Sequence, residues 1–294
     1  MQFTKVLKPY RVTDGKKFRL KDHDPKDTGR FDREDADEAK ELLAEGVGML
    51  SELHERLYAE DKASALFVFQ AMDAAGKDGA IKHVMTGLNP QGCQVSSFKS
   101  PSSADLDHDY LWRCQRELPE RGRIGIFNRS YYEEVLVVRV HPEYLAQQRL
   151  PEKPSGDDLW EERYRQIRQF ERYLTANGTR VTKFFLNVSK EEQRRRFLER
   201  IDKEAKNWKF SSSDVKERGY WKDYMAAYEA MIAATASEES PWYVVPADNK
   251  WFSRLVVAAA AVDTLQRIDP KFPKVSAAKK AELASYRKAL LAKD

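Results

Sequence analysis

Cysteine and histidine are scarce in this 294-residue sequence, and neither residue type is spaced for chemistry. The two cysteines, Cys93 and Cys114, show no metal-ligand spacing, which favours a reduced cytosolic protein over a disulfide-stabilised secreted one. Of the five histidines, His83, His108 and His141 are too scattered to suggest a metal centre or a Ser-His-Asp arrangement. The sequence therefore points away from disulfide scaffolds and triad hydrolases.

Long apolar runs and an excess of one charge are also missing. The longest clean apolar stretch, Leu255–Val262, is too short to cross a bilayer, and residues 1–12 lack the apolar centre of a signal peptide. Because 51 basic residues face 47 acidic ones, the net charge is only +4. We expect no membrane partner, no nucleic-acid partner and a cytoplasmic location, and any anion site must come from local clustering of basic residues.

What is present is an alternation of strand-like and helix-like segments, in a chain with 41% hydrophobic and 33% charged residues. Apolar runs predict strands at residues 65–70, 93–98, 123–127, 181–188 and 242–245. Apolar residues at helical spacing predict helices at 36–60, 77–87, 105–118, 157–176, 191–206, 220–234, 251–267 and 276–292. This alternation predicts an α/β fold with a parallel sheet covered on both faces. Ligands then bind at the carboxyl ends of the strands.

The first predicted strand leads into a candidate phosphate loop. Residues 65–83, ALFVFQAMDAAGKDGAIKH, have the layout of a strand, an anion-cradling turn and a helix start. The loop is irregular, because Ala71 replaces the first glycine of the Walker A pattern and Asp78 replaces its hydroxyl residue. Lys77 can reach terminal phosphates as a point charge or be an ordinary surface lysine. A cation at a helix start opposes the helix dipole by about 0.3–1 kcal/mol, so its placement favours a nearby anion.

Two carboxylates, those of Asp73 and Asp78, belong to the same loop. Beside a phosphate chain they would repel it, by about 1 kcal/mol for each pair of charges in water. The arrangement makes sense where Mg²⁺ bridges carboxylate and phosphate oxygens. Alternatively, Asp73 is a turn residue and Asp78 simply suits the positive end of the helix dipole.

A second polar cluster follows the third predicted strand, at residues 127–143, FNRSYYEEVLVVRVHPE. Arg129 comes directly after the strand, on the expected ligand side, and its planar fork suits a phosphate. Glu133 and Glu134 follow within one helical turn, where they could hold Mg²⁺, orient an acceptor or form a solvated helix start. Arg139 is either a second phosphate contact or a surface residue.

A basic segment, RRRFLERIDKEAKNWK at residues 194–209, follows the fourth predicted strand. Ser189 and Glu192 before it predict a capping box at the start of its helix. Seven basic residues outnumber three acidic ones in the segment, which is typical of a solvated helix face or of a mobile lid that screens phosphate charge. Trp208 and Phe210 could stack on a base, pin the lid shut or pack in the core.

Four segments together resemble the polyphosphate kinase 2 family: MDAAGKDG (72–79), GIFNRSYYEEVLVVRVHPE (125–143), NWKFSSSDVKER (207–218) and PWYVVPADNKW (241–251). The similarity covers about residues 10–268, and the order and spacing of the segments are more specific than any one of them. The form FNRSYYEE is closest to class III, a subgroup taken to accept nucleoside mono- and diphosphates. The family is similar in fold to thymidylate kinase.

The fold that this resemblance implies is a three-layer P-loop kinase fold, a five-stranded parallel sheet flanked by helices, with a helical lid. We divide the chain into a polar N-terminal arm with little core of its own (1–35), a P-loop kinase domain (36–270) with its lid at about 190–222, and a C-terminal helical tail (271–294).

The resemblance and the loop pattern also assign residues to roles. Catalytic roles are expected for Asp73, Lys77, Asn128, Arg129, Glu133 and Glu134. Phosphate-binding roles are expected for Ala75, Gly76, Lys77, Asp78, Gly79, Lys82 and Arg139. The lid residues expected over the phosphates are Arg194, Arg195, Arg200, Lys203, Lys206, Trp208 and Lys209. Asp73 and Glu134 are the expected ligands of Mg²⁺ or Mn²⁺.

The activity implied by the resemblance is reversible phosphoryl transfer between inorganic polyphosphate and nucleotides. The expected nucleotides are AMP, ADP and ATP, with guanine nucleotides as further candidates, and the expected assembly is a homodimer or homotetramer. The acceptor is a phosphate oxygen that is already ionised at pH 7, so no strong general base is needed and alignment with charge neutralisation suffices. Two alternatives stay open. One is an ATP-dependent nucleoside monophosphate kinase, and the other is a non-catalytic polyanion-binding protein with the same fold.

Overall fold

A six-stranded sheet forms the centre of the computed structural model, which describes residues 3–32, 35–150 and 157–292. Its strand order is β1-β6-β5-β2-β4-β3. The strands are β1 (Arg11–Val12), β2 (Ser64–Gln70), β3 (Cys93–Ser97), β4 (Ile124–Asn128), β5 (Thr179–Asn187) and β6 (Trp242–Pro246). Strands β2 to β6 pair in parallel, which confirms the predicted five-stranded parallel sheet. The sixth, β1, pairs antiparallel with β6 and was not predicted, because two residues are too few for a periodic pattern.

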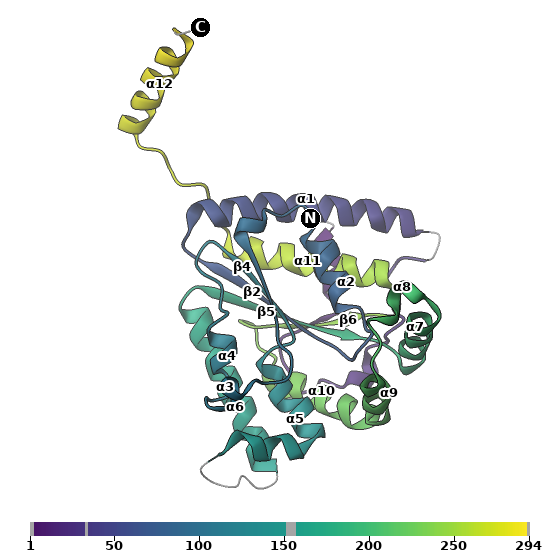
Figure 1. The fold of residues 1–294 in the computed structure, drawn as a ribbon. Coiled ribbons are helices and arrows are strands. Elements are labelled where there is room, and N and C mark those ends of the chain that lie inside the picture. Colours follow the sequence, from purple (N-terminus) through teal and green to yellow (C-terminus); the bar gives the residue numbers. More distant parts are fainter. Residues whose placement is uncertain (1–2, 33–34, 151–156, 293–294) are drawn as a thin grey trace.

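Helices cover both faces of this sheet (Figure 1). One face carries α1 (Ala36–Glu60), α2 (Lys77–Met85) and α11 (Lys250–Ile268), with α11 against the strands and α1 packed on α11. The other face carries α5 (Val137–Val140), α6 (Asp157–Ala176) and α10 (Trp221–Thr235). The three layers of the predicted kinase fold are therefore present.

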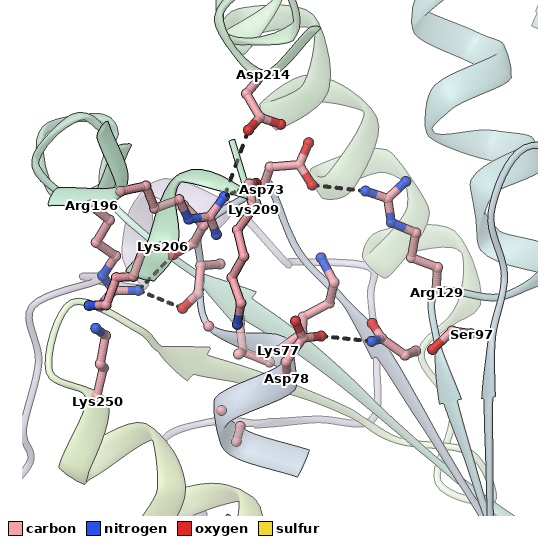
Figure 2. A pocket seen from close by; sticks show the side chains of 18 of the residues that line it. Asp73, Lys77, Asp78, Ser97, Arg129, Arg196, Lys206, Lys209, Asp214 and Lys250 are labelled. Carbon is pink, nitrogen blue, oxygen red and sulfur yellow. Dashed lines mark hydrogen bonds and ion pairs between the residues drawn. The ribbon is translucent and has the colours of Figure 1, made fainter. Parts of the chain in front are cut away.

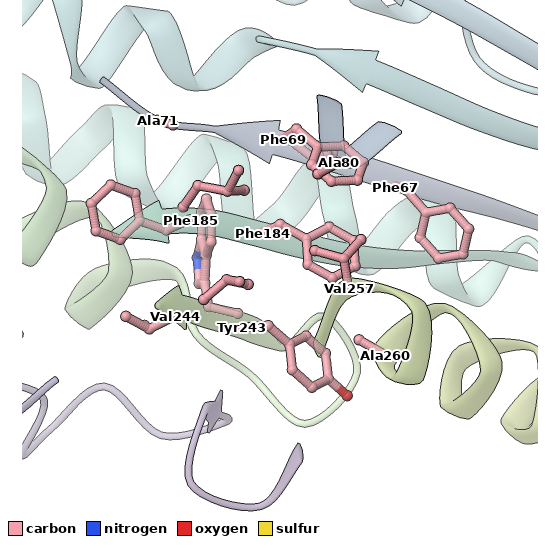
Figure 3. Close-up of a cluster of buried hydrophobic side chains, with 14 of the residues drawn as sticks. Phe67, Phe69, Ala71, Ala80, Phe184, Phe185, Tyr243, Val244, Val257 and Ala260 are labelled. Carbon is pink, nitrogen blue, oxygen red and sulfur yellow. The ribbon is translucent and has the colours of Figure 1, made fainter. Parts of the chain in front are cut away.

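The core between sheet and helices is aromatic on the strand side and small on the helix side. All seven residues of β2 are buried, as expected for a central parallel strand. Phe184 of β5 stacks on Phe69 at 4.7 Å between ring centroids and contacts Tyr243 of β6 at 5.8 Å. Val257 and Ala260 of α11 face these rings (Figure 3). Small side chains on α11 let the helix pack closely against the sheet.

The N-terminal segment corrects one expectation. Residues 1–35 were expected to have little core of their own, yet Leu7, Tyr10, Val12, Leu20 and Phe31 are all buried. The ring of Tyr10 packs edge-on against Phe252 of α11, with centroids 5.7 Å apart. The described residues of the segment also form the 3-10 helices η1 (Phe3–Leu7) and η2 (Leu20–Asp22). Its apolar residues are spaced irregularly among charges, so no period revealed them. Residues 1–2 and 33–34 of this segment lie outside the described structure.

The helix predicted at 105–118 is two short helices, α3 (Ser103–Leu106) and α4 (Trp112–Gln115). Ser102 and Asp105 form a reciprocal capping box that starts α3. The carboxylate of Asp109 then accepts a hydrogen bond from the Leu111 N–H at 2.9 Å, which competes with helical bonding and starts a new turn.

The lid region contains α7 (Lys190–Asp202), α8 (Glu204–Asn207) and α9 (Ser212–Gly219). Ser189 caps α7 as predicted by accepting a hydrogen bond from the Glu192 N–H at 3.0 Å. The reciprocal half of the capping box is absent here, because Glu192 binds Arg195 and Arg196 and the Ser189 N–H donates to Asp248 instead.

The C-terminal tail ends in α12 (Ala277–Leu291), which stands away from the rest of the molecule (Figure 1). Its described residues are exposed along the whole helix; residues 293–294 lie outside the described structure. The remaining short elements are η4 (Pro90–Gly92), η5 (Tyr131–Val135) and η6 (Pro142–Gln148). Within the described ranges, no helix combines the length and the apolar character needed to span a membrane.

Candidate active site

The phosphate loop lies between β2 and α2, at the carboxyl edge of the sheet. Two residues in it adopt left-handed backbone conformations, Ala74 at φ +63° and Gly76 at φ +111°. The first helical bond of α2 runs from the Ala80 N–H to the Gly76 carbonyl at 3.0 Å, so the preceding N–H groups have no intrahelical partner. A Cβ added at Gly79 would meet no protein atom within 4 Å. The loop therefore offers backbone donors beside open space, as an anion site requires.

A cavity of about 760 Å³, the phosphate cavity, opens over this loop. Its walls come from the carboxyl ends of β2, β3 and β4, the start of α11 and the lid (Figure 2). Nine cationic side chains line it: Lys77, Lys99, Arg129, Arg196, Arg200, Lys206, Lys209, Lys250 and Arg254. Only four acidic side chains do so: Asp73, Asp78, Glu199 and Asp214. The local charge is strongly positive although the whole chain is nearly neutral, which suits a polyanion.

Arg129 joins two of the predicted carboxylates, those of Asp73 and Glu133. Its backbone is left-handed, at φ +66°, and its N–H donates to the Phe69 carbonyl at 3.0 Å. Its guanidinium donates to Asp73 at 2.8 Å and lies 3.7 Å from Glu133. The carboxylates of Glu133 and Asp73 raise the pKa of Arg129, whereas burial raises the pKa of Glu133 above its ordinary value. A strained backbone held in this way is typical of a functional position.

Lys77 and Asn128 complete the loop side of the site. The Lys77 ammonium donates to the Ala71 carbonyl at 3.0 Å. Burial and the nearby Arg129 charge lower the pKa of Lys77, which Asp73 partly offsets. The Asn128 amide donates to Asp78 at 2.9 Å, which ties the end of β4 to the start of α2. The structure thus brings five predicted catalytic residues together: Asp73, Lys77, Asn128, Arg129 and Glu133.

The sixth predicted catalytic residue, Glu134, faces a neighbouring cavity of about 270 Å³, the side cavity. There its carboxylate lies 3.2 Å from Arg163 and accepts a hydrogen bond from Gln148 at 2.8 Å. Glu133 lines the same side cavity. Successive residues of a 3-10 helix point about 120° apart, so the two carboxylates have different partners, Arg129 for Glu133 and Arg163 for Glu134. Asp73 lines the phosphate cavity and Glu134 the side cavity, so the structure does not bring these two expected metal ligands together.

Arg196 at the root of the lid holds the phosphate loop in place. Its buried guanidinium donates to the carbonyls of Ala74 and Ala75 in the loop, and to those of Ala247 and Asp248 after β6. Its Nε lies 2.7 Å from Glu192. The carbonyls of the loop are thereby turned toward α7, and the loop and the β6–α11 turn are held as one unit.

Comparisons with known proteins agree with this geometry. The sequence model described as polyphosphate kinase 2 matches residues 32–273. The chain belongs to this family. The ADP-polyphosphate phosphotransferase of Rhodopseudomonas palustris is 51% identical to this chain, called the kinase from here on, over 94% of this chain and 98% of the relative's own length. The AMP/ADP-polyphosphate phosphotransferase of Meiothermus ruber is 44% identical over 91% and 96%.

A solved structure agrees as well. The crystal structure of polyphosphate kinase 2 from Arthrobacter aurescens TC1 matches the fold of the kinase with a TM-score of 0.85 and 38% sequence identity, over 95% of this chain and 96% of that one. The family and the fold predicted from the sequence are therefore confirmed.

Only some of the lid residues that were predicted to lie over the phosphates line the phosphate cavity. Arg200, Lys206, Trp208 and Lys209 line the cavity. Arg194, Arg195 and Lys203 do not line it. Arg195 pairs with Glu192, and Lys203 pairs with Glu199. Trp208 is exposed and Phe210 packs on Phe197 with centroids 6.3 Å apart, so only the tryptophan faces the cavity.

Two predicted phosphate ligands of the kinase lie elsewhere. Lys82 is exposed on α2 and is not among the residues that line either cavity. Arg139 donates a hydrogen bond to the Tyr164 hydroxyl and lies over the Trp160 ring, 5.8 Å from its centroid. Both positions follow from helix geometry, since each side chain lies on a helix face turned away from the loop.

Several cavity residues of the kinase were missed from the sequence. Lys99 follows β3, and Lys250 and Arg254 are one turn apart at the start of α11. All three come after the carboxyl end of a strand, so the rule that ligands bind at that edge was the available signal. Asp214 of α9 gave no such signal, because it reaches the cavity only through the folding of the lid.

The acidic side chains of the kinase could bind a divalent cation only together with oxygens of the substrate. No group of three or more His, Cys, Asp or Glu side chains in the described ranges could hold a metal by itself. Mg²⁺ is usually held by one or two carboxylates plus substrate phosphates. Asp73 and Asp214 both line the phosphate cavity. Burial raises the pKa of Asp214, and the charge of Asp73 adds to this shift. These are the side chains that could supply protein oxygens.

Proposed function

We propose that the kinase transfers phosphoryl groups between inorganic polyphosphate and nucleotides, making ADP and ATP from AMP and ADP, and that the transfer is reversible. The observation that carries the proposal is the phosphate cavity, in which nine cations surround a phosphate loop. A donor with three phosphates needs only part of such a surface, whereas a longer polyphosphate chain can engage all of it.

The two cavities suggest where each substrate lies. The phosphate cavity takes the polyphosphate chain, with its terminal phosphate at the loop and Lys77. The side cavity takes the nucleoside of the acceptor, because Phe98, Tyr110 and Tyr144 offer aromatic surface there. Arg129 lines both cavities, so it would contact the phosphate that passes between donor and acceptor.

The chain's own residues then align the reaction and neutralise its charge. Lys77 and Arg129 stabilise negative charge on the transferred phosphoryl group, and the lid cations exclude water and screen the donor. The acceptor oxygen is already ionised, so the transfer needs no strong general base. Asp73, with Asp214 nearby, would hold Mg²⁺ or Mn²⁺ against phosphate oxygens, and the ion would supply further charge neutralisation.

The range of acceptors is proposed from the relatives. The relative from Rhodopseudomonas palustris is named for ADP, that from Meiothermus ruber for AMP and ADP, and one from Pseudomonas aeruginosa for GDP. We infer that the kinase uses adenine mono- and diphosphates and accepts guanine nucleotides as well. A cytoplasmic location follows from the need for a nucleotide pool, and a homodimer or homotetramer is the expected assembly.

Initial rates test the proposal. The purified kinase is supplied with polyphosphate, Mg²⁺ and one of AMP, ADP, GMP or GDP, without ATP. Formation of ADP and ATP from the adenine nucleotides is expected; if no product forms until ATP is added, the protein is an ATP-dependent nucleoside monophosphate kinase instead. EDTA should abolish turnover, excess Mg²⁺ should restore it, and Asp73→Asn should raise the Mg²⁺ concentration that half-maximal activity requires.

A further inference from the structure

A fully buried ion pair lies beneath the active site, on the α6 and α10 side of the sheet. The Lys183 ammonium of β5 has no exposed surface and lies 2.6 Å from the carboxylate of Glu171 in α6. It also donates to the Thr235 carbonyl at 2.8 Å. Burial lowers the pKa of Lys183, and the Glu171 charge opposes that shift. A buried pair of this kind contributes little net stability compared with apolar packing, so its retention calls for another reason.

The other partners of Glu171 come from the active-site segment. The hydroxyls of Tyr131 and Tyr132 both donate to Glu171 Oε1, at 2.9 Å and 2.7 Å. The Tyr132 hydroxyl also accepts a hydrogen bond from Lys183 at 3.2 Å. Both tyrosines are buried. Two adjacent side chains of η5 are thus fixed to one carboxylate whose own orientation is set by the lysine.

These two tyrosines lie between the residues that face the substrates. Arg129 precedes them by two residues in a left-handed conformation, and Glu133 follows directly. Because the backbone from β4 to η5 is short and turns sharply, a shift of the tyrosine pair moves both charged groups. The left-handed backbone of Arg129 persists only where surrounding contacts hold it.

We propose that Glu171 and Lys183 are positioning residues for phosphoryl transfer, which act through Tyr131 and Tyr132 to aim Arg129 and Glu133. Neither charged residue lines the phosphate cavity or the side cavity. The network rests on the proposed function in one respect, since it matters to turnover only if Arg129 acts on the transferred phosphate. A group displaced by about 1 Å can cost on the order of 100-fold in rate.

The test uses variants that keep the core intact. Tyr131→Phe/Tyr132→Phe removes both hydroxyls and leaves the ion pair in place. Glu171→Leu/Lys183→Met removes both charges at once, because removing one alone would leave a buried charge unpaired. The matched control is Thr182→Val/Thr264→Val: these buried threonines share a hydrogen bond of 2.8 Å, and Thr182 adjoins Lys183 on β5 but points to the opposite face of the sheet.

Steady-state rates with polyphosphate and ADP are measured for each variant, alone and combined with Arg129→Lys. We expect the tyrosine variant to lower kcat by about 10–100-fold, with a much smaller change in KM and a cooperative thermal transition. In the Arg129→Lys background the same change should have little further effect, because both changes act on one group. The threonine control should leave kcat within about twofold.

Three outcomes overturn the proposal: both network variants keep wild-type kcat, their losses simply multiply with that of Arg129→Lys, or the threonine control loses as much. Arg129→Lys alone keeps the two ideas apart. If it retains full turnover, the proposed role of Arg129 fails. If it loses turnover while both network variants do not, only the positioning role of Glu171 and Lys183 fails.

Discussion

The guanidinium of Arg129 donates a hydrogen bond of 2.8 Å to the carboxylate of Asp73. The two residues come from different loops, one after β4 and one after β2, and neighbouring parallel strands bring them together. The same guanidinium lies 3.7 Å from Glu133. One cation is therefore shared by two carboxylates beside Lys77, and the pKa values of Lys77, Arg129 and Glu133 are all shifted by burial and by the neighbouring charges.

Lys77→Met tests the phosphate loop. Loss of this charge should lower kcat by about 100–1000-fold, as for other groups that stabilise a transition state. The melting temperature should not fall, because burial already disfavours the ammonium and lowers its pKa. Lys40→Met, at an exposed lysine of α1 that pairs with Asp37, is the control and should change neither quantity. A polyphosphate binder without activity would instead lose only a few-fold in affinity.

Glu133→Gln should exchange activity for stability. Burial raises the pKa of Glu133 in the folded state above its ordinary value of 4.5. The stabilising contribution of the protonated form is therefore complete below the unfolded-state pKa and is lost as the pH rises through the folded-state pKa. At pH 7 the glutamine variant should melt higher, by about 2–4 °C for each kcal/mol, with kcat reduced about tenfold or more.

Thermal melts of both proteins between pH 4 and pH 8 provide the check. The difference in melting temperature should shrink toward zero at the acid end, where Glu133 is protonated in both states. A wild-type protein that is more stable than the variant at pH 7 would contradict the sign of the shift.

Arg196→Met and Arg195→Met form a matched pair on the lid helix. Arg196 is buried and binds four carbonyls of two loops, whereas Arg195 is exposed, and both pair with Glu192. Loss of Arg196 leaves buried carbonyls without donors, at about 1–3 kcal/mol for each unsatisfied group. We expect a lower melting temperature and a higher KM for polyphosphate. Arg195→Met should stay near wild type in both measurements. Equal losses in the two variants would show that Arg196 does not hold the two loops together.

Salt should weaken the binding of the donor more than that of the acceptor. Polyphosphate binding releases counterions, so log KM for polyphosphate should rise linearly with log salt concentration, while KM for AMP rises less steeply. Lys250→Met removes one cavity cation that the sequence did not reveal. By analogy with single-stranded nucleic acids, it should reduce the slope by about 0.7. An unchanged slope would place Lys250 outside the path of the polyphosphate chain.

The order of the strands and helices along the chain could be predicted because each of these elements depends on a local sequence pattern. The buried run of β2, the capping residue Ser189 and the Gly76-Lys77 pair each carry their structural meaning within a few residues. The two-residue strand β1 and the break between α3 and α4 were missed. Their stability comes from partners far along the chain, as with Tyr10 and Phe252, or from a single side-chain bond.

The sequence by itself determined the family, the phosphate loop and the residue types that the chemistry needs, because each is a short motif with a fixed local geometry. Only the tertiary structure decided which of those residues act together. It gave the adjacent Glu133 and Glu134 different partners, Arg129 and Arg163, and bound Arg196 to the carbonyls of two loops. It also brought Lys250 and Asp214 to the phosphate cavity. The physical reason is that side-chain direction depends on helix phase and on packing between distant segments, neither of which a local pattern contains.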